Sequence, residues 1–209
     1  GQARSRVDSG SYNRQIAAAV VLPVPYDATA SFKSGAREGP EAIISASREL
    51  EEYDAELRCS PCSMGISTAH AVEPHMGSPE EMVARVAQAV APAVREQKLV
   101  ATLGGDTPGT IGAVQAFASQ HRDLSVLYLD AHADLRQEYL GTSWGHASTA
   151  RRISELCPLV LAGVRSMSRE EAELIESSNI PCFPWNGDES DLPAEEIVAA
   201  LSPDLYISI

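Results

Sequence analysis

Basic residues and long apolar runs are both scarce in this 209-residue sequence. Its 16 lysines and arginines stand against 29 aspartates and glutamates, and the resulting net charge of −13 argues against binding to a nucleic-acid backbone. The longest apolar stretches, such as residues 16–24, are far shorter than the roughly 20 residues that cross a bilayer. We therefore expect neither a nucleic-acid partner nor a membrane span, whereas small-molecule chemistry remains open.

Cysteine is scarce as well. The four cysteines are too few and too scattered for a disulfide framework in a chain of this length, so a reducing, cytoplasmic setting is expected. Cys59 and Cys62 form a CxxC pair, which could bind zinc or act as a redox couple. No second CxxC and no nearby Cys/His pair completes a zinc site, so an incidental pair of loop thiols is the favoured interpretation.

What is present is the composition of a globular domain, with 44% apolar and 22% charged residues. Apolar β-rich runs alternate with helical patterns throughout, which is typical of an α/β fold with a mostly parallel sheet. We expect one domain over residues 1–209. The expected strands cover residues 16–22, 98–103, 124–129, 159–164, 181–185 and 205–209, and the expected helices cover 41–53, 78–96, 111–120, 147–155 and 193–201, with one more opening at Ser168.

Prolines mark several of these boundaries. Pro23 and Pro25 are expected to end the first strand, because proline cannot donate a ladder hydrogen bond. Ser78 followed by Pro79 predicts a helix start in which the serine is the N-cap. Pro92 predicts a kink or an early stop in the same helix.

Two carboxylates and an imidazole directly follow the apolar run at residues 124–129. Asp130, His132 and Asp134 alternate with alanines, and residues two apart in an extended chain point to the same side. Three ligand-type groups are therefore expected to face one space, with the alanines packed behind them. A metal ion would compensate the burial of such groups, and mixed oxygen and nitrogen ligands suit a divalent ion such as Mn²⁺.

A second strand end is expected at the same edge, where Gly104, Gly105 and Asp106 follow the strand at 98–103. In open parallel sheets the loops at the carboxyl ends of the strands form the ligand crevice. For any one of these residues alone, a helix cap or a satisfied hydrogen bond is the commoner role. The alternating triplet, together with this Gly-Gly-Asp end and His146 downstream, favours a metal site.

Four segments resemble the ureohydrolase family, which comprises arginase, agmatinase, formimidoylglutamase and relatives. They are PYDATASFKSGAREGPEAI near the start, LGGDTPGTIG at 103–112, LDAHADLRQEYLGTSWGHASTARRI at 129–153 and LVLAGVRS at 159–166. The loop in the third segment is most similar to the agmatinase-like branch. The resemblance implies a three-layer α/β/α fold with a mostly parallel central sheet, in a homo-oligomer that is a trimer or a hexamer.

The resemblance also implies a mechanism, in which two Mn²⁺ ions share a hydroxide that attacks a guanidino carbon and releases urea. Asp130 and Asp134 would bind one ion, with Asp130 bridging to the second ion and His132 binding that second ion. His146 matches a family histidine proposed to shuttle a proton near the leaving amine; a loop or helix-cap histidine is the alternative. We expect a small guanidino substrate, agmatine in the first place, and Mn²⁺ as the cofactor.

Two departures from the family pattern concern the ligands. Thr107 stands where the family motif GGDH supplies a histidine, and a threonine hydroxyl is a poor substitute for imidazole on Mn²⁺. The family's later Asp-x-Asp motif is not reached by Ile209, and Asp204 begins a strand rather than ending one. The chain is therefore expected to be a piece of a ureohydrolase domain, incomplete at its C-terminus, with an incomplete metal site.

Three functions follow from these patterns. The first is Mn²⁺-dependent hydrolysis of a guanidino C–N bond by an agmatinase-like enzyme, which would convert agmatine to putrescine and urea. The second is a non-catalytic protein of the same fold, suggested by Thr107. The third is a nucleotide-binding domain that holds phosphate at the turn of Gly104 and Gly105, although neither GxGxxG nor GxxxxGK[ST] is present there.

Overall fold

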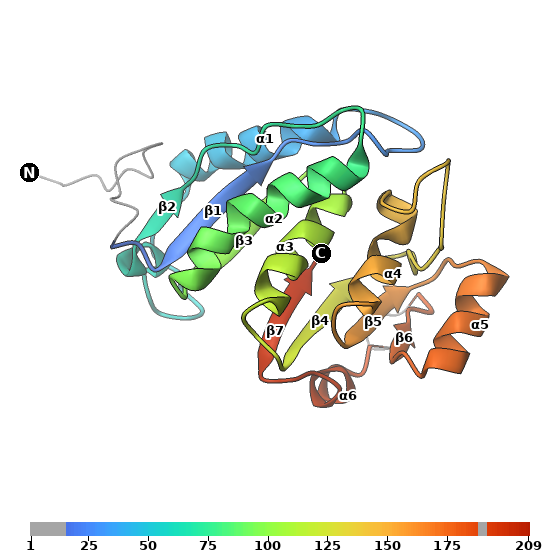
Figure 1. The fold of residues 1–209 in the computed structure, drawn as a ribbon. Coiled ribbons are helices and arrows are strands. Elements are labelled where there is room, and N and C mark those ends of the chain that lie inside the picture. Colours follow the sequence, from blue (N-terminus) through green and yellow to red (C-terminus); the bar gives the residue numbers. More distant parts are fainter. Residues whose placement is uncertain (1–15, 188–191) are drawn as a thin grey trace, which may run out of the picture.

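Strands and helices alternate along the chain in the computed structural model, which describes residues 16–187 and 192–209 (Figure 1). The strands are β1 (Ala19–Val24), β2 (Ile66–Thr68), β3 (Leu99–Gly104), β4 (Leu124–Leu129), β5 (Leu159–Val164), β6 (Cys182–Pro184) and β7 (Asp204–Ser208). The α-helices are α1 (Gly39–Ala46), α2 (Pro79–Arg95), α3 (Pro108–Ala118), α4 (Thr149–Ser154), α5 (Arg169–Ser178) and α6 (Ala194–Ala199). The predicted α/β fold class is confirmed.

The strands form two parallel sheets rather than one continuous sheet. Their orders are β2-β1-β3 and β6-β5-β4-β7, and every paired neighbour is parallel. Strands β3 and β7 lie at the junction of the two sheets, where the hydroxyl groups of Thr102 and Tyr206 are 3.0 Å apart. Within each sheet the carboxyl ends of the strands therefore lie on one side, and the arrowheads of β1, β4 and β7 point the same way in Figure 1.

Helices cover both faces of the sheets, because successive strand residues point to opposite sides. Val126 and Tyr128 of β4 enter a core that also contains Ile153 of α4. Leu127 and Leu129, on the other face, pack in a cluster with Ile197 of α6. Within the described ranges, no helix is long and apolar enough to cross a membrane.

The predicted start of α2 is confirmed, whereas several other predicted boundaries differ from the structure. The Ser78 hydroxyl accepts a hydrogen bond from the Glu81 N–H at 3.1 Å, and α2 runs past Pro92 without stopping. The helix expected over residues 41–53 is α-helical only to Ala46, and a 3₁₀ turn (Ser47–Glu49) follows it. The first strand begins at Ala19 rather than at residue 16, and Pro23 does not end it; it continues to Val24 and stops directly before Pro25.

Pro23 is tolerated within β1 because of where β2 stops. The pairing of β1 with β2 ends at Val21, and Pro23 is the next residue of β1 whose backbone groups face the same side. On that side the carbonyl oxygen of Pro23 accepts a hydrogen bond from the Val72 N–H at 2.9 Å. The missing proline N–H therefore faces no strand and leaves no ladder bond unmade.

Gly112 lies where α3 crosses α2 with no room for a side chain. A Cβ at Gly112 would overlap the carbonyl oxygen of Val83 and lie 2.9 Å from Val86 Cβ, whereas a Cβ at Gly39 of α1 would meet open space. We expect Gly112→Ala to lower the free energy of unfolding by about 2 kcal/mol through overpacking. Gly39→Ala is the matched control and should raise that free energy by up to about 1 kcal/mol. Chemical denaturation measures both, and equal stabilities would contradict the close helix contact.

Candidate functional site

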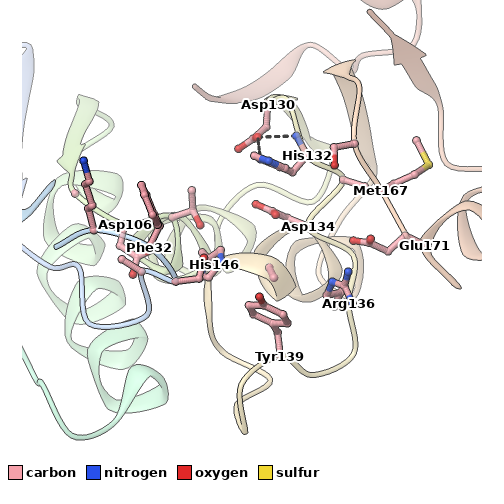
Figure 2. A pocket seen from close by; sticks show the side chains of 18 residues that line it. Phe32, Asp106, Asp130, His132, Asp134, Arg136, Tyr139, His146, Met167 and Glu171 are labelled. Atoms are coloured by element: carbon pink, nitrogen blue, oxygen red, sulfur yellow. Dashed lines mark hydrogen bonds and ion pairs between the residues drawn. The ribbon is translucent and has the colours of Figure 1, made fainter. Parts of the chain in front are cut away.

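Loops at the carboxyl ends of β1, β3, β4 and β5 enclose a cavity of about 640 Å³ (Figure 2). This is the position at which ligands bind in open parallel sheets. The two strand ends expected to meet, after β3 and after β4, do meet here. The cavity wall includes Asp106, Thr107, Asp130, His132, Asp134 and His146, so all the residues predicted for the site line one space.

Asp130 and His132 form one side of this cavity. The segment continues from β4 beside the end of β5, with His132 in a parallel bridge to Ser166. Asp130 Oδ1 accepts a hydrogen bond from the His132 N–H at 2.8 Å and lies 3.2 Å from His132 Nδ1. The His132 side chain is 65% exposed and that of Asp130 is 23% exposed. A carboxylate oxygen and an imidazole nitrogen therefore lie side by side where solvent reaches them.

Asp134 departs from the expected alternation. Its φ of 49° places it in the left-handed region, so the extended chain ends at Ala133. Ala133 is fully buried, but it lines the cavity instead of lying behind it. Asp134 is also buried, and its Oδ2 accepts a hydrogen bond from the Tyr128 hydroxyl at 2.8 Å. Burial raises the pKa of Asp134 to about 7, although the bond from Tyr128 opposes that rise. The Asp130–His132 pair is thus accessible to solvent, whereas the Asp134 carboxylate is buried.

Glu171 of α5 stabilises the turn at Asp134. Its Oε1 accepts a hydrogen bond from the Leu135 N–H at 2.9 Å, and its Oε2 accepts one from the Ser168 N–H at 2.6 Å. The Ser168 hydroxyl in turn accepts from the Glu171 N–H, which completes a capping box. The Ser-x-x-Glu spacing signals this cap in the sequence. Nothing in the sequence indicates that the same carboxylate also binds the turn after Asp134.

Thr107 is turned toward another hydroxyl group. Its backbone is already helical at the start of α3, and its side chain does not cap that helix. Its Oγ1 lies 3.1 Å from Thr149 Oγ1 at the start of α4. The hydroxyl at the position of the family histidine therefore connects two helices at the cavity wall.

Thr29, which the sequence patterns did not single out, connects the Gly-Gly-Asp end to His146. Its N–H and its hydroxyl both donate to Asp106 Oδ2, at 3.0 and 2.6 Å. Its Oγ1 accepts a hydrogen bond from the His146 N–H at 3.1 Å. Gly105 permits this approach, because a Cβ there would lie 2.6 Å from the carbonyl oxygens of Tyr26 and Ala36.

The donor set fits a divalent cation in its chemistry, and it is not a complete ligand set. Asp130, His132 and Asp134 supply the oxygen and nitrogen donors that such ions take, and a cation would compensate the buried carboxylate of Asp134. Among the described residues, however, no group of three or more His, Cys, Asp or Glu side chains is arranged to hold an ion. The three side chains therefore line one cavity, and among the described residues they do not close around one point.

Parallel sheets with helices on both faces, and an acidic crevice at the carboxyl ends of the strands, place this protein among the α/β proteins that bind ligands at that end of the sheet. The model of the arginase family matches residues 17–209. The chain therefore belongs to the arginase family, in agreement with the resemblance of its motifs.

Relatives within and around this family share the sequence and the fold to different extents. The N(1)-aminopropylagmatine ureohydrolase of Thermus thermophilus is 42% identical over 192 residues, which cover 91% of this chain and 66% of the relative. The agmatine ureohydrolase structure of Thermoplasma volcanium has a TM-score of 0.85 at 27% identity and covers 97% of this chain and 69% of that one. A formiminoglutamase of Trypanosoma cruzi solved with Mn²⁺ has a TM-score of 0.80 at 17% identity, over 96% and 72% of the two chains. The chain thus spans just under two thirds of the length of its curated relative.

Proposed function

We propose that this chain is part of a Mn²⁺-dependent amidinohydrolase of the agmatinase type, which hydrolyses a guanidino C–N bond of a linear amine and releases urea. The observation that carries the proposal is the meeting of Asp130, His132, Asp134 and His146 in one cavity at the carboxyl edge of the sheet. Membership of the arginase family supports the reaction class. The manganese of the T. cruzi relative supports the choice of ion.

The charges of the cavity support a cationic substrate. The acidic side chains Asp106, Asp130, Asp134 and Glu171 line it, and Lys33 and Arg136 are the basic residues in the same wall. An acidic cleft raises the local concentration of cations such as guanidinium compounds. Agmatine is the first candidate substrate, and the name of the T. thermophilus relative adds N1-aminopropylagmatine, a longer cation of the same class.

Each side chain of the cavity has a role in this proposal. Asp130, His132 and Asp134 would hold the cation, and Thr107 is the weak position of the set. A bound divalent cation supplies Lewis acidity and lowers the pKa of water at the site. His146, on the wall formed by the turn before α4, would move a proton to the leaving amine. The acidic wall would orient the cationic tail of the substrate.

Urea release from agmatine and from N1-aminopropylagmatine in the presence of Mn²⁺ tests the proposal. We expect wild-type protein to release urea from at least one of them, and His132→Ala to lower the rate by roughly 10-fold or more, in line with losses caused by changes around metal ligands. His121→Ala is the matched control, because His121 follows α3 at the opposite edge and contacts Asp204. Wild-type release no greater than that of His132→Ala would overturn the proposal and leave a non-catalytic member of the family.

A further inference from the structure

The hydroxyl of Thr29 contacts groups that follow two different strands. It donates to Asp106 Oδ2, after β3, at 2.6 Å. It accepts from the backbone N–H of His146, in the segment between β4 and β5, at 3.1 Å. The ring atom His146 Nδ1 lies 3.5 Å from the same oxygen, a separation longer than the roughly 2.7–3.2 Å of ordinary N–H···O bonds. One oxygen atom thus lies against both the backbone and the ring of His146.

The proton of this hydroxyl is committed to Asp106. Oδ2 also accepts the Thr29 N–H at 3.0 Å, so this oxygen acts as the acceptor in both contacts. A separation of 2.6 Å is within the range of short, charge-assisted O–H···O⁻ bonds, which are roughly twice as strong as neutral ones. Turning the hydroxyl toward His146 would break this bond and gain only a longer one.

A threonine hydroxyl has one proton and two lone pairs. With its proton on Asp106, Thr29 Oγ1 offers only lone pairs to His146. The backbone N–H of His146 donates to one lone pair, and the ring Nδ1 faces the other lone pair. An unprotonated Nδ1 would bring two lone pairs together, whereas a protonated Nδ1 donates a hydrogen bond.

We propose that Thr29 is a positioning residue that selects the neutral His146 tautomer with its proton on Nδ1. Nε2 is then the unprotonated nitrogen, free to take up a proton and pass it to a ligand in the cavity that His146 lines. The ring of Tyr139 restricts the imidazole further through a T-shaped contact, with ring centroids 5.6 Å apart. The direction of proton movement rests on the proposed function; the tautomer is a property of the folded protein alone.

Nitrogen-15 NMR of histidine-labelled protein, at a pH where the ring is neutral, tests the tautomer directly. The signals of His146 are assigned by their loss in His146→Gln. In the wild type we expect a pyrrole-type shift for Nδ1 and a pyridine-type shift for Nε2, the reverse of the tautomer that free histidine prefers in water. An Nε2–H tautomer in the wild type would overturn the proposal without any variant.

Two substitutions at Thr29 separate the hydroxyl from the shape of the side chain. Thr29→Val keeps the shape and removes the hydroxyl, so His146 should revert to the Nε2–H tautomer. Thr29→Ser keeps the hydroxyl and should retain Nδ1–H. Circular dichroism of both variants verifies their fold. A folded Thr29→Val protein that retains Nδ1–H would show that another group selects the tautomer, and the proposal would fail.

Kinetics connect this inference to the reaction. Where wild-type protein releases urea, Thr29→Val should lower kcat roughly 10- to 100-fold and leave KM unchanged. This loss is part of the roughly 100- to 10,000-fold that a positioned proton donor contributes to the rate. Thr29→Ser should restore kcat. A rise in KM with unchanged kcat would contradict a role in proton transfer. Absence of urea release from the wild type counts against the proposed function, and the NMR result still decides the tautomer.

Discussion

Asp130→Asn should weaken Mn²⁺ binding more than about 100-fold, because changes next to a metal ligand already cost about 10- to 100-fold and this change removes the charge of a proposed ligand. Asp130 interacts with both of the other proposed ligands, His132 and Asp134. Its Oδ1 lies 3.2 Å from His132 Nδ1, and its charge contributes to the raised pKa of Asp134. Asparagine keeps the shape of the side chain, so the loss isolates the charge. Isothermal titration of chelator-treated protein with Mn²⁺ measures the affinity.

Asp123→Asn is the matched control for this experiment. Asp123 directly precedes β4, at the opposite end of the strand from Asp130, and it is exposed. The same loss of one carboxylate charge should leave the affinity for Mn²⁺ close to that of the wild type, because the cavity lies at the far end of the strand. Wild-type affinity in Asp130→Asn, or an equal loss in both variants, would remove Asp130 from the metal site.

Sequence analysis places correctly those strands that are continuous apolar runs in the sequence. β4 and β5 match the expected ranges 124–129 and 159–164. Both are apolar over most of their length because helices cover the two faces of their sheet. β2 is only three residues long, with Ser67 at its centre, and it was missed. Its conformation depends on pairing with β1, a contact between distant residues that no local pattern reports.

In the site, too, local spacing predicts some residues correctly and misses those that depend on contacts between distant parts of the chain. The alternation rule places Asp130 and His132 correctly, because the chain stays extended beside Ser166. It fails at Asp134, since the turn there depends on Glu171, which is 36 residues from the Leu135 N–H that it binds. Thr29 is likewise 77 residues from Asp106 and 117 from His146. Spacing within a motif cannot report contacts of this kind, which arise only when several strand ends meet.

Burial of Asp134 should make the metal-free protein less stable as the pH rises. Burial is the main cause that raises the pKa of this carboxyl to about 7, and the charge of Asp130 adds to it. In the unfolded chain an aspartate has a pKa of about 3.9. Between these two values the folded protein holds more protons than the unfolded chain, so the free energy of unfolding falls as the pH increases. The stabilising contribution of protonated Asp134 is complete below pH 4 and is lost once the pH passes about 7.

Asp134→Asn removes this titration and should therefore flatten part of the pH dependence. The pKa of Asp134 differs by about three units between the folded and unfolded states, and each unit corresponds to about 1.36 kcal/mol. Between pH 4 and pH 8 the free energy of unfolding of the wild type should therefore fall by up to about 4 kcal/mol relative to that of the variant. Urea denaturation of chelator-treated proteins across this range measures the difference. Tyr128→Phe provides a second comparison: the Tyr128 hydroxyl lowers the pKa of Asp134, so its removal should move the end of the decline to higher pH. Parallel stability curves for wild type and Asp134→Asn would mean that the carboxylate is ionised in the folded protein throughout, and that solvent or another group already compensates its charge.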